Sequence, residues 1–211
     1  MIIIIGNQKG GAGKSTLTLL LANYLTLVKK RTVTVIDMDY QESLSQKFEK
    51  AKVLENEEPY EVVKAALEDF PDLLEVMKTD SQALILIDLP GKLDDDGLLP
   101  VFKAAELVIC PFAYDEFSFE STVLFSVVLK KVSPDCRLLF IPNRVKANVK
   151  YDTQVDVNEQ LSKFGPVLQA IPDRIDFQRT STFQTPLAVF PVVRPVFDAL
   201  YKQYLKLTPD E

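Results

Sequence analysis

The sequence predicts an α/β fold, a doubly wound and mostly parallel sheet that is flanked by helices. Two observations support this fold class. Short apolar runs recur along the chain and are almost continuously apolar, which is typical of parallel strands that are buried on both faces. Segments with helical spacing of apolar residues lie between these runs, and strands that alternate with helices form parallel sheets.

The apolar runs are the predicted strands. The first reads IIII and the third reads ALILID, and polar turn residues follow each run. We expect strands at residues 2–5, 32–37, 83–88, 106–111, 137–142 and 166–171.

The helices are predicted from apolar residues that recur every three or four positions. Leu17, Leu21 and Leu25 lie at this spacing within residues 14–30, and the basic run 29–31 complements a helix C-terminus. The other helices are expected at residues 42–50, 59–69, 97–105, 119–132, 153–164 and 193–206. The last of these ends without a basic face, so we expect it to cover the core and not to bind a membrane.

Composition excludes several classes of protein. The 211 residues are 47% hydrophobic and carry a net charge of −6, which argues against coating nucleic acid by bulk charge but leaves room for a local basic face. The chain has no histidine, which excludes Ser-His-Asp and Cys-His catalysis and argues against a zinc site. Cys110 and Cys136 form no CxxC pair and lie in apolar stretches, so we expect buried, reduced thiols.

Neither a leader nor a membrane span is predicted. The opening MIIII is too short for a signal peptide and no apolar run reaches the roughly 20 residues of a membrane helix. No linker or repeat divides the chain. We therefore expect a soluble, cytoplasmic protein with one domain, residues 1–211.

A glycine-rich loop follows the first predicted strand and leads into a helix, as a phosphate-binding loop requires. Its backbone N–H groups would converge on one anion at the helix N-terminus. Lys14 would reach the β- and γ-phosphates of a nucleotide, and the Ser15 hydroxyl would bind Mg²⁺. A turn that binds nothing is disfavoured because KGGxGK[ST] is rare by chance. The predicted nucleotide-binding residues of the loop are Gly10, Gly11, Ala12, Gly13, Lys14, Ser15 and Thr16.

The loop departs from the general pattern GxxxxGK[ST], because Gln8 stands at the first glycine position. From Asn7 it reads NQKGGAGKST and resembles the deviant Walker A loop of the ParA/MinD family of ATPases, to which nitrogenase iron protein is also related. In that family the additional lysine, here Lys9, crosses a dimer interface and contacts the partner's nucleotide. The resemblance therefore implies a homodimer with ATP and a catalytic role for Lys9 beside Lys14.

Two strand ends extend the resemblance. Residues 35–41 read VIDMDYQ and are similar to the family's DxDPQ, with Tyr40 in place of proline. The resemblance implies that Asp39 orients the attacking water. Residues 84–90 read LILIDLP and resemble a Walker B strand, so that Asp88 would act on Mg²⁺ through water. Carboxylates at the C-terminal ends of adjacent parallel strands converge on one crevice.

The adenine site is predicted from looser matches. Asn143 follows the run 137–142, where the family has an asparagine that binds adenine, and Asp173 follows the run 166–171, where a loop wraps the base. Both residues are also ordinary turn formers that need no ligand.

The resemblance implies a ParA-like ATPase that dimerises around Mg-ATP and uses slow, partner-stimulated hydrolysis to partition or position DNA. We expect no N-terminal DNA-binding extension of the kind that some members carry, and therefore no specific operator binding by this chain alone. Non-specific DNA contacts would be made by basic residues on one edge, and a small adaptor protein would stimulate turnover. Alternatively these cations are scattered and solvated. The candidates are Arg144, Lys146, Lys150, Arg174, Arg179 and Arg194.

Two other functions stay open. The same ATPase could act on a protein partner, in mobile-element transfer or in positioning a protein assembly. A metabolic enzyme of the same superfamily, such as a dethiobiotin-synthetase-like ligase or a small-molecule kinase, is the third alternative. Lys9 and the DMDYQ segment favour the two switch functions.

Overall fold

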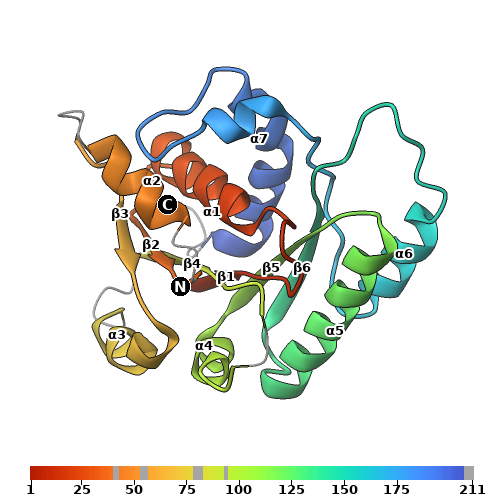
Figure 1. Ribbon diagram of the computed structural model, residues 1–211, viewed down its shortest axis with the longest axis horizontal. Helices are drawn as coiled ribbons and strands as arrows, with labels where there is room; N and C mark the ends of the chain where they lie inside the picture. Colours follow the sequence, from red (N-terminus) through yellow and green to blue (C-terminus); the bar gives the residue numbers. More distant parts are fainter. Residues whose placement is uncertain (40–42, 53–56, 78–82, 93–94, 207–211) are drawn as a thin grey trace.

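The computed structural model describes residues 1–39, 43–52, 57–77, 83–92 and 95–206 (Figure 1). Its centre is a six-stranded sheet in the order β3-β2-β4-β1-β5-β6, in which every neighbouring pair is parallel. The predicted fold class is therefore confirmed. The strands are β1 (Ile2–Ile5), β2 (Val33–Asp37), β3 (Glu61–Lys64), β4 (Leu84–Asp88), β5 (Leu107–Phe112) and β6 (Arg137–Pro142).

Helices cover both faces of the sheet. In Figure 1, α1, α2 and α7 lie on one side of it, and α3, α4 and α5 lie on the other. The helices are α1 (Lys14–Asn23), α2 (Ser43–Lys52), α3 (Phe70–Met77), α4 (Leu98–Ala104), α5 (Glu116–Val132), α6 (Gln154–Ser162) and α7 (Val189–Leu200). π-helical turns extend α1 over Tyr24–Val28 and α7 over Tyr201–Leu205, and 3-10 turns occupy Leu67–Asp69 and Ile175–Arg179.

The continuously apolar strands follow from this layering. Ile3 and Ile5 of β1 pack into the core beneath α1 and α7, whereas Ile2 and Ile4 pack into the second core, on the side of α4 and α5. Because successive strand residues point to opposite faces, both sets must be apolar when both faces are covered.

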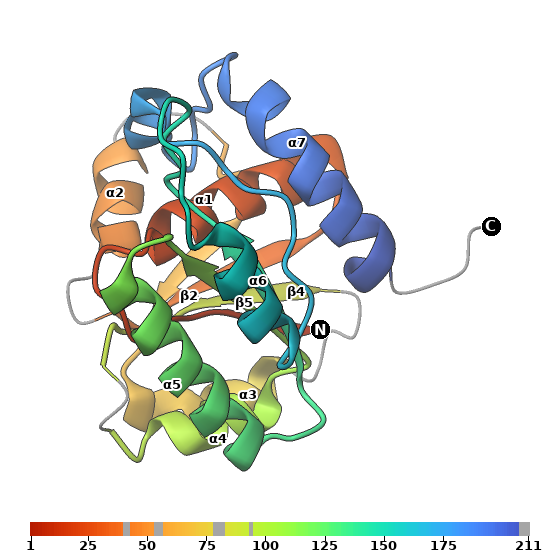
Figure 2. The same ribbon diagram turned by 90° about the vertical axis from the view of Figure 1, so that its right-hand side faces the viewer.

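The last helix covers the core, as the sequence predicts. Val193, Val196, Phe197 and Leu200 of α7 are buried, and their hydrophobic cluster includes apolar residues of α1. The two helices lie side by side in Figure 2. Among the described residues, no helix has the length and apolar character needed to span a bilayer.

The helix predicted at residues 59–69 is wrong. This segment forms β3, Glu61–Lys64, and a 3-10 turn, and α3 then follows at Phe70–Met77, where no helix was predicted. β3 is the edge strand, and its burial pattern runs exposed, intermediate, intermediate, exposed. An edge strand with so little burial lacks the continuous apolar run that identifies the inner strands.

The strand predicted at residues 166–171 is also wrong. The segment runs beside β6 and forms an isolated bridge between Phe140 and Val167 and a backbone hydrogen bond from Ile171 to Pro142, but no continuous strand. A second bridge joins Val145 to Pro172. The Pro166 carbonyl accepts from the Phe140 N–H, but Pro166 has no N–H of its own to donate, so a ladder with β6 cannot continue through this residue.

Both cysteines are free and buried, as predicted. Burial raises the pKa of the Cys136 thiol to about 11, and it raises the pKa of Cys110 still further. Both thiols are therefore protonated and unreactive near neutral pH.

Candidate functional site

Three neighbouring strands end at one level and bring the predicted residues to one edge of the sheet. In the register of the sheet, Asp88 of β4 lies opposite Ile5 of β1 on one side and opposite Asp37 of β2 on the other. The glycine-rich loop leaves β1 directly after Ile5. The loop and the strand-end carboxylates therefore converge at the C-terminal edge, where open α/β sheets bind ligands.

The loop depends on glycine at two positions. Gly11 has φ 77° and Gly13 has φ 89°, both in the left-handed region that L side chains rarely adopt. A methyl group at Gly13 would also lie 2.3 Å from the side-chain nitrogen of Asn143. Gly13 is the N-cap of α1, and the first turn of this helix contains no acidic residue. The helix therefore presents its N–H groups and positive dipole end to an anion.

Lys14 lies inside the loop. It is only 6% exposed, and its ammonium nitrogen would be 3.5 Å from a Cβ placed on Gly91, which also approaches the backbone of Gly10. Sequence reasoning missed Gly91. Its position directly after the Asp88-Leu89-Pro90 strand end was the available signal, because a glycine there permits close approach of two loops.

Asp88 is buried completely and is only partly satisfied. One carboxylate oxygen accepts a hydrogen bond from Thr18 Oγ1 at 3.3 Å, and the Ser15 side chain also bonds the carboxylate. The other oxygen, Oδ2, has no partner among the described residues. Burial raises the Asp88 pKa to about 7, Asp37 and Asp39 contribute to the rise, and Ser15 and Lys14 oppose it.

This environment fits a magnesium ion. A buried carboxylate oxygen without a donor, close to a serine hydroxyl, offers the hard oxygen ligands that Mg²⁺ takes. Ser15 and Asp88, the two residues predicted for the metal, are therefore brought together by the structure.

Asp37 has a structural task that the sequence analysis did not assign. It is 1% exposed, and its Oδ2 accepts from the backbone N–H groups of Leu44 and Ser45 and from Ser45 Oγ, at 3.2, 2.8 and 2.9 Å. Its Oδ1 accepts from the N–H of Asp39 at 3.3 Å. Asp37 thus ties the start of α2 to the end of β2 and holds the turn that carries Asp39. Tyr40 and the residue after it in the predicted motif lie outside the described residues.

Asn7 is a third residue that the sequence analysis left without a role. Its amide nitrogen donates to the Pro111 carbonyl and to Thr122 Oγ1, at 2.8 and 2.9 Å, and its Oδ1 accepts from the N–H of Lys9 at 2.9 Å. Asn7 lies within the quoted motif, and its position just after the first predicted strand was the available signal in the sequence. The Lys9 ammonium lies 5.5 Å from the centroid of the Phe117 ring.

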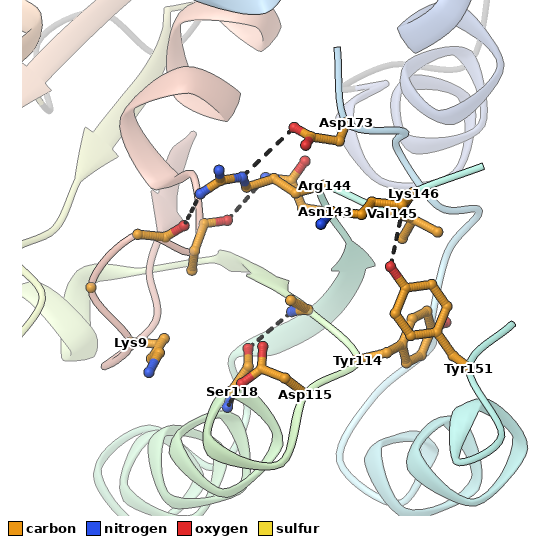
Figure 3. A pocket seen from close by; sticks show the side chains of 14 residues that line it. Lys9, Tyr114, Asp115, Ser118, Asn143, Arg144, Val145, Lys146, Tyr151 and Asp173 are labelled. Atoms are coloured by element: carbon orange, nitrogen blue, oxygen red, sulfur yellow. Dashed lines mark hydrogen bonds and ion pairs between the residues drawn. The ribbon is translucent and has the colours of Figure 1, made fainter. Parts of the chain in front are cut away.

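The predicted adenine residues lie beside the loop (Figure 3). Asn143 is 6% exposed and donates from its side-chain nitrogen to the Ala12 carbonyl at 2.9 Å. Arg144, which has φ 57°, donates to the Gly11 carbonyl at 3.1 Å and lies 3.8 Å from the Asp173 carboxylate. The structure therefore brings both residues to the loop: Asn143 bonds it directly, and Arg144 links Asp173 to it.

A pocket of about 400 Å³ opens at this side of the loop. Its far wall carries Tyr114 and Tyr151, whose ring centroids are 5.3 Å apart. The lining residues are Lys9, Gly10, Gly11, Ala12, Ala113, Tyr114, Asp115, Ser118, Asn143, Arg144, Val145, Lys146, Tyr151 and Asp173. Polar groups surround an otherwise apolar hollow, as in small-molecule sites.

Four of the six candidate DNA-contacting cations lie beside carboxylates. The distances between the charged groups run from 3.4 to 3.8 Å, and the side chains are exposed or half-exposed. Such pairs reduce the positive potential that a phosphate backbone would meet. The pairs are Arg144–Asp173, Lys150–Asp152, Arg174–Asp176 and Arg194–Asp198.

Comparison with known proteins adds independent evidence. Residues 3–187 match the family model described as the CobQ/CobB/MinD/ParA nucleotide binding domain. No curated protein sequence matches the chain.

Solved structures share the fold. A plasmid partition protein from Borrelia burgdorferi is 20% identical, with a TM-score of 0.71 over 96% of this chain and 98% of that chain. A second Borrelia burgdorferi structure, bound to AMPPNP, is 21% identical, with a TM-score of 0.75 over 96% of this chain and 98% of that one. The cell division ATPase MinD from Pyrococcus furiosus is 21% identical, with a TM-score of 0.69 over 98% and 99% of the two chains.

Proposed function

The chain belongs to the CobQ/CobB/MinD/ParA nucleotide-binding domain family, and from this premise we propose that it is a ParA-like ATPase switch. In this proposal it binds Mg-ATP, forms an ATP-dependent homodimer, hydrolyses ATP slowly, and uses the cycle to partition or position DNA with an adaptor protein. The entire chain, residues 1–211, acts as one ATPase domain.

The phosphate loop supports ATP as the ligand. Glycines at positive φ and the first turn of α1 provide converging N–H donors. Lys14 adds a cation inside the loop. A structure of similar fold binds AMPPNP, an ATP analogue, which agrees with a triphosphate ligand here.

Hydrolysis transfers the γ-phosphoryl group to water, so the water–phosphorus bond forms as the bond to the β-phosphate oxygen breaks. Asp39 orients the water, and Lys14 stabilises the negative charge that develops on the phosphate oxygens. Asp37 keeps Asp39 in place through its bond to the Asp39 N–H. Ser15 and Asp88 would hold Mg²⁺, which neutralises phosphate charge when it is bound.

The proposal of a dimer rests on the different locations of the two loop lysines, Lys14 and Lys9. Lys14 is buried within its own loop, whereas the Lys9 ammonium lies over Phe117 of α5. The Lys9 ammonium therefore lies beside α5, whereas Lys14 lies within the loop. A cation on the outer lip is placed to complete the site of a facing subunit, as an arginine finger does.

The test is Lys9→Ala, with Lys92→Ala as the matched control, because Lys92 is exposed and lines the same outer hollow as Lys9. We expect Lys9→Ala to retain most ATP affinity in calorimetry but to lose ATP-induced dimerisation in light scattering and to lose phosphate release. Normal dimerisation and turnover in this variant would contradict the proposal.

A mixture of variants tests the shared site more sharply. In a heterodimer of Lys9→Ala with Lys14→Ala, one site has an intact Lys14 and faces an intact Lys9. We expect phosphate release to return partly in the mixture, up to one site per dimer. A mixture as inactive as its components, although heterodimers form, would argue against a site shared between subunits.

The role of Asp39 has its own test. Asp39→Ala should bind ATP and dimerise but release little phosphate, because the attacking water is no longer oriented. The control Asp72→Ala changes an exposed carboxylate in α3, which lies on the opposite side of the sheet from α1. Phosphate release at the wild-type rate from Asp39→Ala would exclude this role.

A protein cargo in place of DNA is the second candidate function. The observation that favours it is the pairing of four candidate cations with carboxylates, together with exposed apolar residues on α5. DNA binding by the ATP-bound dimer should be non-specific and should weaken steeply with salt, because phosphate contacts release counterions. Absence of DNA retention by that dimer at low salt would favour the protein cargo.

A further inference from the structure

The side chain of Lys9 rests on an aromatic ring that is itself exposed. Its ammonium lies 5.5 Å from the centroid of Phe117, within the range of a cation–π contact. Phe117 is 69% exposed. A phenylalanine so open to water gains little stability from burial, and the face of its ring is accessible to the Lys9 ammonium.

Among the described residues, the ammonium of Lys9 forms no ion pair with a nearby carboxylate. Glu120 of α5 lines the same hollow as Lys9, yet within the described part of the chain no ion pair joins Lys9 to a carboxylate. A ring orients a cation without neutralising it. The charge of Lys9 therefore stays available to an anion that arrives from outside.

The ring stands on a fixed platform. Asp115 caps α5 by accepting from the N–H of Ser118 at 2.9 Å, and Ser118 Oγ accepts from the N–H of Ala113 at 2.9 Å. Phe117 lies within this capped first turn. Capping holds the turn in one conformation, so the ring has a defined place relative to the loop.

The same helix also fixes the backbone of Lys9. Asn7 accepts from the Lys9 N–H and donates to Thr122, which belongs to α5. Asn7 is 1% exposed, so these bonds are shielded from water and hold firmly. The Lys9 N–H group is therefore held to α5 through Asn7 and Thr122, and the Lys9 ammonium contacts α5 at Phe117.

We propose that Phe117 is a positioning residue that holds the Lys9 ammonium outward and presents it to the nucleotide of a second copy of this chain. The inference rests on the proposed function, because it needs Lys9 to act across a dimer. Phe117 acts through Lys9 and not by contact with the nucleotide. The ring lowers the number of conformations that Lys9 must lose when the dimer forms.

The contact itself is tested in the nucleotide-free protein, without any dimer. Aromatic ring currents shift the NMR signals of the Lys9 Cε–Hε group, which Lys9→Ala identifies by its disappearance. We expect the shift to be lost in Phe117→Leu and kept in Phe117→Tyr, which retains a ring. Lys9 signals that are identical in wild type and Phe117→Leu would overturn the proposal.

The functional consequence is tested by the dimer dissociation constant at saturating ATP. Phe117→Leu should weaken the dimer by about two- to five-fold, the factor that corresponds to an exposed cation–π contact, while ATP affinity of the monomer is unchanged. Phe117→Tyr should restore wild-type dimerisation. The control is Leu124→Ala, which removes an apolar side chain that is 50% exposed two turns further along the same face of α5.

The outcomes separate this inference from the function on which it rests. A wild-type protein that does not dimerise with ATP overturns both. ATP-dependent dimerisation that is unchanged in Phe117→Leu overturns only the role of Phe117. Equal weakening in Phe117→Leu and Leu124→Ala also overturns that role, because it assigns the effect to apolar contact between subunits.

Discussion

The floor and the rim of the phosphate site differ in how they are held. The floor consists of Lys14, Asp37 and Asp88, which are 6%, 1% and 0% exposed. The rim consists of Lys9, Arg144 and Asp173, and the side chains of the latter two are 57% and 44% exposed. Both regions carry charges at the same loop, but the rim side chains are far more exposed to water than those of the floor.

This difference determines what each region can do. Interactions on the floor are strong, since buried charges and hydrogen bonds are poorly screened and a group left without a partner is costly. Interactions on the rim are screened by water and salt. We infer that the floor sets nucleotide binding and stability, whereas the rim is free to exchange its contacts when a ligand or a second subunit arrives.

The largest effect is expected on the floor, at Lys14. Lys14→Ala should weaken ATP and ADP binding by at least ~100-fold, about 3 kcal/mol, which is the upper range for a hydrogen bond to a charged group. Calorimetry measures this, with Lys92→Ala as an exposed-lysine control. If Lys14→Ala bound ATP as tightly as wild type, the nucleotide could not be assigned to this loop.

The next largest effect is expected at Gly13, and Gly10 in the same loop serves as its comparison. Gly13→Ala should lower the free energy of unfolding by about 2–3 kcal/mol, because a left-handed backbone costs ~1–2 kcal/mol and the new methyl group meets Asn143. Gly10→Ala should change it by less than ~0.5 kcal/mol, because nothing lies within 4 Å of the added methyl group. Chemical denaturation without nucleotide compares the two, and equal destabilisation would contradict the geometry of the loop.

Asp88 predicts a pH dependence of the floor. Its pKa is raised from 3.8 to about 7 in the folded protein, so between these values the folded state holds a proton that the unfolded state has lost. Asp88 therefore contributes stability to the nucleotide-free protein that is fully present below pH 3.8 and is lost as the pH rises to about 7.

The neutral variant Asp88→Asn isolates this effect. It should lack the pH-dependent fall and be more stable than wild type by about 1–2 kcal/mol at pH 8, within the usual cost of a buried polar group without a partner. Unfolding by urea at pH 5 and pH 8 measures the difference. An identical pH dependence of stability in both proteins would show that a group other than Asp88 causes it.

The smallest effect is expected on the rim. Arg144→Ala removes the exposed pairing with Asp173 and the bond to Gly11, and should change the free energy of unfolding by less than ~1 kcal/mol. The residual change should shrink further at high salt. Urea denaturation at two salt concentrations tests this, and a loss as large as that of Gly13→Ala would show that the rim is as firmly built as the floor.

Two residues of the floor, Lys14 and Asp88, could be predicted from the sequence. Lys14, Ser15 and Asp88 lie together as their motifs predict, because motif spacing and parallel strands place them at one edge. The partners of these residues could not be predicted. Gly91, Asp37 and Asn7 act through contacts with segments far away in the chain, and no local pattern reports such contacts.

The sequence by itself determined the fold class, the glycine-rich turn after β1 and the inner strands, because continuous apolar runs and glycine conformation are local properties of the chain. It did not determine the edge strand β3 or the segment at 166–171, where packing and proline decide whether a ladder forms. Only the tertiary structure decided where Lys9 points, because its two anchors, Asn7 and Phe117, meet it through α5. Sequence fixes local conformation, but the direction of a side chain depends on neighbours that folding alone brings together.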